Sequence, residues 1–307
     1  MKMGSDNILE IKNLSISYKD NKIIDDIDLD IERGKIYSII GPNGCGKTTL
    51  IRAMSRNIKP QNGDMLLSGK NIFKTGTKNV ARKMAVLYQS NSTMSDATVR
   101  QLVQYGRFAY KRWWKGFEKE DAEIVDWALE KTGLAAFENR KINTLSGGER
   151  QRAWIAMAIA QKPEILLLDE PTTFLDICHQ LEIMELVAKL NREEGITIVM
   201  VLHDINHAAR YSDELIVIKD HKIFKKGDPW TILKSDVLRC AFRVEAQISR
   251  DVETNKPIFY AKKMVVSCSG SGIEYIKKRG EKKMKKVLAL LLVLIMSLGM
   301  FAGCAKK

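Results

Sequence analysis

A glycine-rich stretch near the N-terminus constrains this chain more than any other feature. Residues 41–48 read Gly-Pro-Asn-Gly-Cys-Gly-Lys-Thr, which fits the phosphate-binding loop pattern G-x-x-x-x-G-K-T. An apolar run at residues 35–40 predicts a buried strand before the loop, and residues 49–54 predict the start of a helix after it. Strand, glycine-rich loop and helix are the context in which this pattern binds a nucleotide. A plain glycine-rich turn is the alternative interpretation.

Each residue type in the loop has a chemical reason to be there. Glycines let the backbone curl so that N–H groups point at phosphate oxygens, and the helix N-terminus adds a partial positive charge. We expect Lys47 to reach the β- and γ-phosphates and the Thr48 hydroxyl to ligate Mg²⁺. The nucleotide-binding residues predicted from this stretch are Gly41, Pro42, Asn43, Gly44, Cys45, Gly46, Lys47, Thr48 and Thr49. A thiol reagent on Cys45 is therefore expected to block nucleotide binding.

Two carboxylates follow a second apolar run. Residues 165–168 read Ile-Leu-Leu-Leu, which is typical of a parallel strand buried on both faces, and Asp169 and Glu170 come next. Ligands of α/β sheets bind at the carboxyl ends of the strands. We expect Asp169 to hold Mg²⁺ through water and Glu170 to orient and deprotonate an attacking water. A turn that merely ends a strand is the alternative.

A second phosphate cradle is predicted at Ser146, Gly147 and Gly148. These residues open a helical run that continues from Arg152 to Gln161, so they form another anion-binding helix N-terminus. One nucleotide needs only one phosphate loop. The second cradle therefore predicts a composite site that another copy of the chain closes.

These motifs, in this order and spacing, resemble the ATP-binding subunits of ABC transporters over roughly residues 6–260. The resemblance implies an α/β P-loop NTPase fold with a parallel sheet core, an antiparallel β subdomain and a helical subdomain at about 95–160. It also implies that Tyr18 stacks on adenine and that Asp176 lines a dimer interface. By the same resemblance, Gln89 senses Mg²⁺ and touches the permease, and His203 contacts the γ-phosphate.

Four further segments, at residues 98–107, 152–161, 172–180 and 201–213, narrow the family. They are similar to ATPases of the iron(III)–siderophore importers for ferrichrome, ferric citrate and ferric enterobactin. These importers are related to the cobalamin importer. This similarity implies ATP and Mg²⁺ as cofactors, a homodimer, a separate membrane permease and, indirectly, a substrate-binding lipoprotein. It places the chain on the cytoplasmic face of a bacterial cell membrane. Two residues depart from the pattern: Tyr88 replaces a common proline, and His221, predicted in a hairpin turn, replaces a common glycine.

Two alternative functions share part of this pattern. Import of cobalamin or haem uses the same motifs. A non-transport ABC ATPase of translation or DNA repair is disfavoured, because the translation type usually carries two such domains. The repair type inserts a long coiled coil, whereas here positions 47 and 145 are only 98 positions apart, and the sequence between them shows no heptad run.

The charge of the chain is concentrated in its last residues. Residues 262–307 hold eleven Lys/Arg and two acidic residues, a balance of +9 that leaves +4 for residues 1–261 out of a total of +13. The basic charge therefore gives no reason to infer a nucleic-acid partner. Trp113 and Trp114 lie among basic residues, but we expect them to cover the helical subdomain or to meet the permease. The five cysteines show no paired spacing, which favours a reducing compartment over disulfides or zinc.

The chain is predicted to divide into an ATPase domain at 1–261, a basic linker at 262–283 and a signal-like segment at 284–307. In that segment, Lys285 and Lys286 precede seventeen uncharged residues, which end in Ala302 and Gly303 directly before Cys304, as in a bacterial lipoprotein signal. We favour a joined reading frame, in which Met284 is the initiator of a neighbouring lipoprotein. A membrane anchor near the short limit for spanning a bilayer, or a buried helix, are the alternatives.

Overall fold

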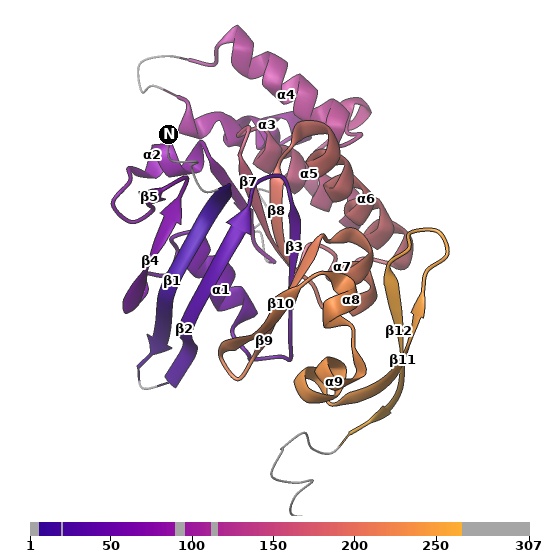
Figure 1. The fold of residues 1–307 in the computed structure, drawn as a ribbon. Coiled ribbons are helices and arrows are strands. Elements are labelled where there is room, and N and C mark those ends of the chain that lie inside the picture. The colour runs from indigo at the N-terminus through magenta and orange to yellow at the C-terminus, as the bar shows by residue number, and fades with distance from the viewer. Residues whose placement is uncertain (1–5, 20, 90–95, 112–115, 266–307) are drawn as a thin grey trace, which may run out of the picture.

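The computed structural model describes residues 6–19, 21–89, 96–111 and 116–265 (Figure 1). A four-stranded antiparallel sheet is built largely from the N-terminal residues; its order is β2 (Asn21–Glu32), β1 (Asn7–Tyr18), β4 (Asn62–Leu67) and β5 (Lys70–Asn71). Long strands with roughly alternating buried residues pair along β1 and β2. This sheet confirms the expected antiparallel β subdomain.

A six-stranded sheet forms the centre of the molecule. Its order is β10 (Lys222–Gly227), β9 (Glu214–Lys219), β3 (Ile36–Ile40), β8 (Thr197–Val201), β7 (Ile165–Asp169) and β6 (Met84–Leu87). The strands from β9 to β6 pair in parallel, and β10 pairs antiparallel with β9. His221 lies in the turn between β9 and β10 with φ 67°, so its predicted place in a hairpin turn is confirmed.

The central sheet is buried on both faces because its apolar strands alternate between two cores. Leu166 and Leu168 of β7 pack into a core with the helices, while Ile165 and Leu167 pack into a core shared with the antiparallel sheet. The helix α1 (Lys47–Met54) belongs to the second core and lies between the two sheets (Figure 1). The loop that precedes α1 is thereby held at the carboxyl end of β3.

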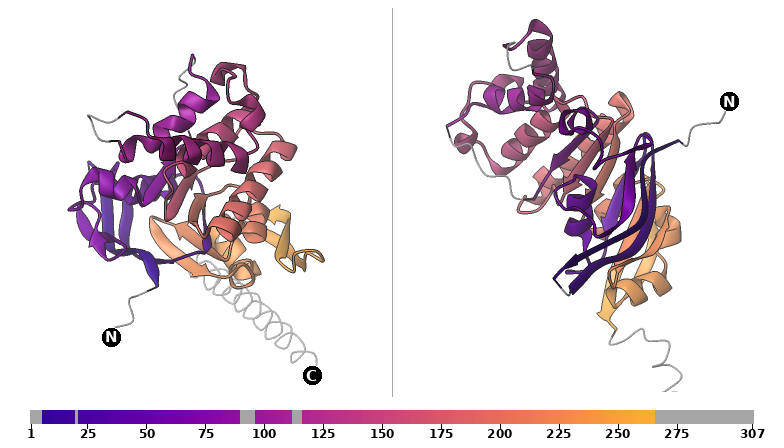
Figure 2. Two further views of the ribbon diagram at one scale, coloured as in Figure 1. Left: turned by 90° about the horizontal axis from the view of Figure 1, so that it is seen from above. Right: turned by 90° about the vertical axis from the view of Figure 1, so that its left-hand side faces the viewer.

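The helical subdomain stands to one side of the sheets (Figure 2). Three helices build most of it: α3 (Val99–Tyr105), α4 (Lys119–Lys131) and α5 (Gly147–Ile159). Short turns link them: η1 (Gly106–Ala109), η2 (Ala135–Phe137) and η3 (Ile142–Thr144). The predicted helical run after the second cradle is confirmed, but α5 already begins at Gly147 and ends two residues before Gln161. Trp113 and Trp114 lie outside the described residues.

The remaining helices pack around the central sheet; they are α2 (Thr77–Ala81), α6 (Ile177–Glu194), α7 (Ile205–Tyr211), α8 (Pro229–Ile232), α9 (Ser235–Val237) and the π-helix η4 (Leu238–Phe242). A C-terminal hairpin of β11 (Val244–Arg250) and β12 (Pro257–Met264) docks on α7. The Asn206 amide donates to the Phe259 carbonyl at 3.3 Å and accepts from its N–H at 3.0 Å.

The hairpin extends past the predicted boundary at residue 261, because β12 runs to Met264. The signal-like segment and most of the predicted basic linker lie outside the described residues, so the division of the tail stays a prediction. Within the part of the chain that the structure describes, none of the helices is both long enough and apolar enough to cross a membrane.

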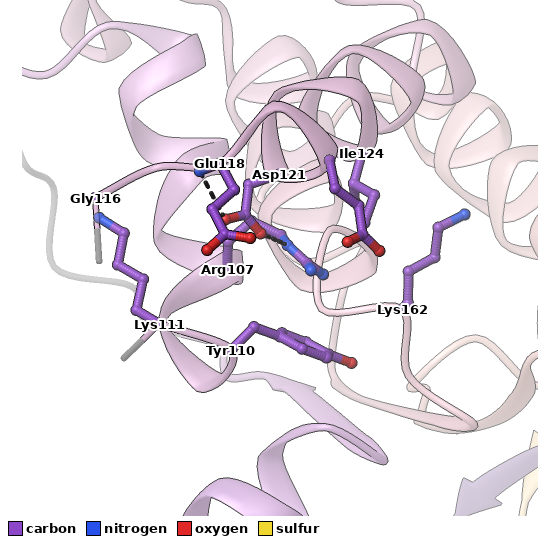
Figure 3. A pocket seen from close by; sticks show the side chains of 9 residues that line it. Arg107, Tyr110, Lys111, Gly116, Glu118, Asp121, Ile124 and Lys162 are labelled. Atoms are coloured by element: carbon purple, nitrogen blue, oxygen red, sulfur yellow. Dashed lines mark hydrogen bonds and ion pairs between the residues drawn. The ribbon is translucent and has the colours of Figure 1, made fainter. Parts of the chain in front are cut away.

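A buried ion pair fixes the helical subdomain. Arg107 is 3% exposed; its Nε donates to Asp121 Oδ1 at 2.8 Å, and its Nη1 donates to the Ala160 carbonyl at 2.8 Å. The guanidinium also stacks 3.9 Å from the centre of the Tyr110 ring. Figure 3 shows these side chains at the edge of a cavity of about 410 Å³, to which Lys111 and Lys162 also contribute. One arginine thus joins η1, the first turn of α4 and the end of α5.

We expect Asp121→Ala to destabilise the protein by about 3–5 kcal/mol, because it leaves the Arg107 guanidinium buried without a counter-charge. The measurement is the urea midpoint, followed by circular dichroism. Glu123→Ala is the control on the same helix, since Glu123 faces Lys119 at 4.0 Å and its side chain is 66% exposed. Equal midpoints for the two variants would contradict the structural role of the pair.

Candidate active site

Two glycines shape the phosphate loop after β3. Gly41 and Gly46 have φ values of 155° and 109°, in the range that favours glycine. A Cβ atom on Gly41 would lie 2.2 Å from the Ile218 carbonyl oxygen, and one on Gly46 would lie 2.6 Å from the Ile23 carbonyl oxygen. The loop is therefore packed against β9 and β2 so tightly that neither position accepts a side chain.

Lys47 and Thr48 lie in the first turn of α1. The Lys47 side chain points to the loop, and the Thr48 side chain points to β7. The Lys47 ammonium is buried and donates to the carbonyls of Gly41 at 2.8 Å and Pro42 at 3.0 Å. Thr48 Oγ1 donates to Asp169 Oδ1 at 3.2 Å. Burial raises the pKa of the Asp169 carboxyl, and the Thr48 hydrogen bond opposes that rise.

Glu170 is the point on which several site residues converge. Its Oε2 accepts from Gln89 Nε2 at 2.6 Å and from Thr173 Oγ1 at 3.1 Å, and its Oε1 lies 2.6 Å from His203 Nε2. The side chain is only 10% exposed, and the backbone adopts φ 54°, which is uncommon outside glycine. The carboxylate is thus held in one orientation by three side chains.

These residues line one cleft of about 490 Å³ together with Tyr18 and residues of the loop. The lining residues are Tyr18, Ile23, Asn43, Gly44, Gly46, Lys47, Thr48, Thr49, Gln89, Glu170 and His203. Gly41 and Cys45 do not line the cleft, because Gly41 packs against Ile218 and Cys45 is buried. The Pro42 carbonyl accepts a hydrogen bond from the Lys47 ammonium. Asp169 does not line the cleft itself, but it accepts a hydrogen bond from Thr48, which does.

The residues of the second cradle do not line this cleft. Ser146 caps α5: its Oγ accepts from the Glu149 N–H at 3.2 Å, while the Glu149 carboxylate accepts from the Ser146 N–H at 2.8 Å. Gly147 and Gly148 follow in the first turn. Asp176 caps α6 by accepting from the His179 N–H at 2.9 Å. Within one copy, these four residues therefore lie outside the cleft.

Sequence reasoning missed two residues at the cleft. Thr173 binds Glu170 directly, and Ile23 lies beside the loop. The position of Thr173, three residues after Glu170 in the turn that follows β7, was the available signal. Ile23 gave none, because its contact with the loop joins residues that are distant in sequence.

The cleft fits a nucleotide and a hard cation. The glycine cradle accepts phosphate oxygens, and the Thr48 and Asp169 oxygens lie side by side, as Mg²⁺ prefers. Among the described residues, no group of three or more His, Cys, Asp or Glu residues could hold a metal alone. Mg²⁺ usually binds one or two protein oxygens together with substrate phosphates.

The fold and the cleft define an ATPase domain of the P-loop type. A family model described as ABC transporter matches residues 24–173. The iron(3+)-hydroxamate import ATP-binding protein FhuC of Bacillus subtilis (strain 168) is 47% identical over 82% of this chain and 94% of that protein. The petrobactin import ATP-binding protein FpuD of Bacillus anthracis is 46% identical over 81% of this chain and 92% of that protein.

A solved dimeric structure of MJ0796, a bacterial ABC transporter cassette, is also similar. Its TM-score is 0.64 with 31% identity, over 72% of this chain and 98% of that chain. The chain therefore belongs to the ABC transporter family, as one of its ATP-binding subunits. The fold class expected from the motifs is confirmed.

We expect the cysteines to differ in reactivity, because the thiolate is the reactive form. Cys45 is 5% exposed and burial raises the pKa of its thiol, whereas Cys178 is exposed. Maleimide at neutral pH should label Cys178 well before Cys45, and the labelling of Cys45 should rise only at higher pH. Peptide mass spectrometry measures both rates in one sample, with Cys178→Ser as the control. Equal rates at neutral pH would show that Cys45 is not protected in the loop.

Proposed function

We propose that this chain hydrolyses ATP to drive the import of iron(III)–siderophore complexes through a separate membrane permease. The observation that carries the proposal is the convergence of Gln89 and His203 on Glu170, beside Lys47 and Thr48, in one cleft. The substrate class rests on the relatives, whose names specify hydroxamate and petrobactin import.

The side chains divide the chemistry among them. Lys47 offsets the charge of the β- and γ-phosphates. Mg²⁺ would bind at Thr48 and Asp169, with Gln89 nearby, and would neutralise charge on the phosphate oxygens. Glu170 accepts the proton of the attacking water, and the contacts to both of its carboxylate oxygens fix its orientation for that step.

His203 and Gln89 contribute positioning. Both contact Glu170 at 2.6 Å, so they orient the general base, and both line the space next to the loop. His203 then meets the γ-phosphate, and Tyr18, on the rim of the cleft, stacks on adenine. Positioning of this kind supplies a large part of the rate in phosphoryl transfer.

Two copies would pair head to tail, so that each ATP lies between the phosphate loop of one copy and Ser146–Gly148 of the other. Asp176 would line the same interface. ATP binding closes this dimer, and hydrolysis at Glu170 opens it. The Gln89 region and the helical subdomain carry the motion to the permease at the cytoplasmic face of the membrane. On the outer side of the membrane, a lipoprotein delivers the substrate to the same permease.

Glu170→Gln should keep ATP binding but lower turnover by about 10²–10⁴-fold, because the amide cannot take up the proton. The variant should also accumulate an ATP-bound dimer, which size-exclusion chromatography with light scattering detects. Glu123→Gln on the exposed face of α4 is the control and should hydrolyse ATP normally. Near-normal hydrolysis by Glu170→Gln would refute the role of Glu170.

The same variant tests the substrate class. Cells that carry Glu170→Gln in place of the native protein should lose uptake of a radioiron–siderophore complex. Their uptake of radiolabelled cobalamin should be unchanged. The reverse pattern would assign the chain to cobalamin import.

Ser146→Arg should leave ATP binding by the monomer intact but abolish ATP-driven dimerisation, because the larger side chain would block the cradle offered to the partner. Calorimetric titration measures the first quantity and light scattering the second. Glu123→Arg, which introduces the same side chain on the exposed face of α4, is the comparison variant. A Ser146→Arg protein that still dimerises with ATP would remove the head-to-tail arrangement.

A further inference from the structure

The second cradle rests directly on the segment that begins α6. A Cβ atom on Gly148 would lie 2.6 Å from His179 Cγ and 2.7 Å from its Nδ1, and one on Gly147 would lie 3.3 Å from Leu175 Cδ2. The imidazole of His179 therefore packs directly against Gly148. This contact joins residues 31 positions apart, at the start of two different helices.

Polar contacts fix the His179 ring in that place. Its Nδ1 lies 3.1 Å from Glu182 Oε2, and because a carboxylate accepts, Nδ1 is the donor. The same Glu182 carboxylate forms an ion pair with Arg152 of α5. On the other side, His179 Nε2 lies 3.9 Å from Asp176 Oδ2, and the His179 N–H donates to Asp176 Oδ1.

We propose that His179 is a positioning residue that holds the Ser146–Gly148 turn and the Asp176 turn as one preformed unit. His179 does not line the cleft of its own copy, whereas both turns are the surfaces assigned to the partner's nucleotide. The inference thus rests on the proposed head-to-tail dimer. Residues whose side chains are locked by packing and hydrogen bonds keep reacting groups in place, and a displacement of about 1 Å can cost about 10²-fold in rate.

Three substitutions separate the two parts of this role. His179→Asn keeps a donor for Glu182 but loses most of the surface against Gly148. His179→Leu keeps the surface but loses the donor, and His179→Ala loses both. If the ring acts through packing and hydrogen bonding together, His179→Ala should have the largest effect and the other two should recover part of it.

The test compares ATP binding with ATP-driven dimerisation in the full-length chain. In His179→Ala, the ATP affinity of the monomer should stay within about twofold of the native value. Turnover and the fraction of ATP-bound dimer should fall about 10- to 10²-fold. The split between an unchanged affinity and a lowered turnover is the expected signature, since a general loss of structure would lower both.

His207 offers a matched control. It occupies the same position in α7, where its N–H donates to Asp204 Oδ1 at 2.9 Å, as the His179 N–H does to Asp176. His207→Ala should therefore dimerise with ATP as the native protein does. An equal loss in His207→Ala and His179→Ala would overturn the proposal, because the effect would then belong to any histidine in a helix start.

Two further outcomes overturn the role of His179. One is native dimerisation and turnover in His179→Ala, and the other is a fall in monomer affinity as large as the fall in turnover. Ser146→Arg, measured in parallel, tests the dimer itself. If Ser146→Arg dimerises with ATP, the proposed head-to-tail function fails. If Ser146→Arg does not dimerise while the His179 variants behave as the native protein does, the dimer stands and His179 has no positioning role.

Discussion

The paired contacts of Glu170 with Gln89 and His203 depend on the order of the strands in the central sheet. Gln89 comes shortly after β6, Glu170 after β7 and His203 after β8, and these three strands are neighbours in parallel. The phosphate loop follows β3, which is the next strand. Because the carboxyl ends of parallel strands meet at one edge, residues from four distant segments reach one carboxylate and one loop.

At the same edge of the sheet, two residues are held in locally unfavourable states by the surrounding packing. Glu170 adopts a left-handed φ, and Asp169 is kept in an environment that raises the pKa of its carboxyl. Asp169 ends a strand that is buried on both faces and bonded on both sides, and Glu170 follows it directly. The packed sheet therefore offsets these local costs and holds both carboxylates in place.

Sequence alone predicted the parts of this protein that are local. The apolar run before Asp169, the glycine pattern before Lys47 and the helix start at Ser146–Gly148 each have a short-range physical cause, and the structure contains each element. The contact of Ile23 with the phosphate loop and that of His179 with Gly148 were not predicted. Both depend on how elements far apart in sequence pack together, and periodicity carries no information about such pairs.

The helix α5 is held at both of its ends by contacts that sequence spacing does not reveal. At its C-terminal end, Arg107 binds the Ala160 carbonyl and pairs with Asp121 of α4. At its N-terminal end, Gly148 packs on His179, and Arg152 pairs with Glu182 of α6. A helix anchored at both ends moves with the elements that anchor it. A displacement of α5 would therefore act on the start of α6 through these contacts, and in the proposed head-to-tail dimer it would reach the partner's nucleotide.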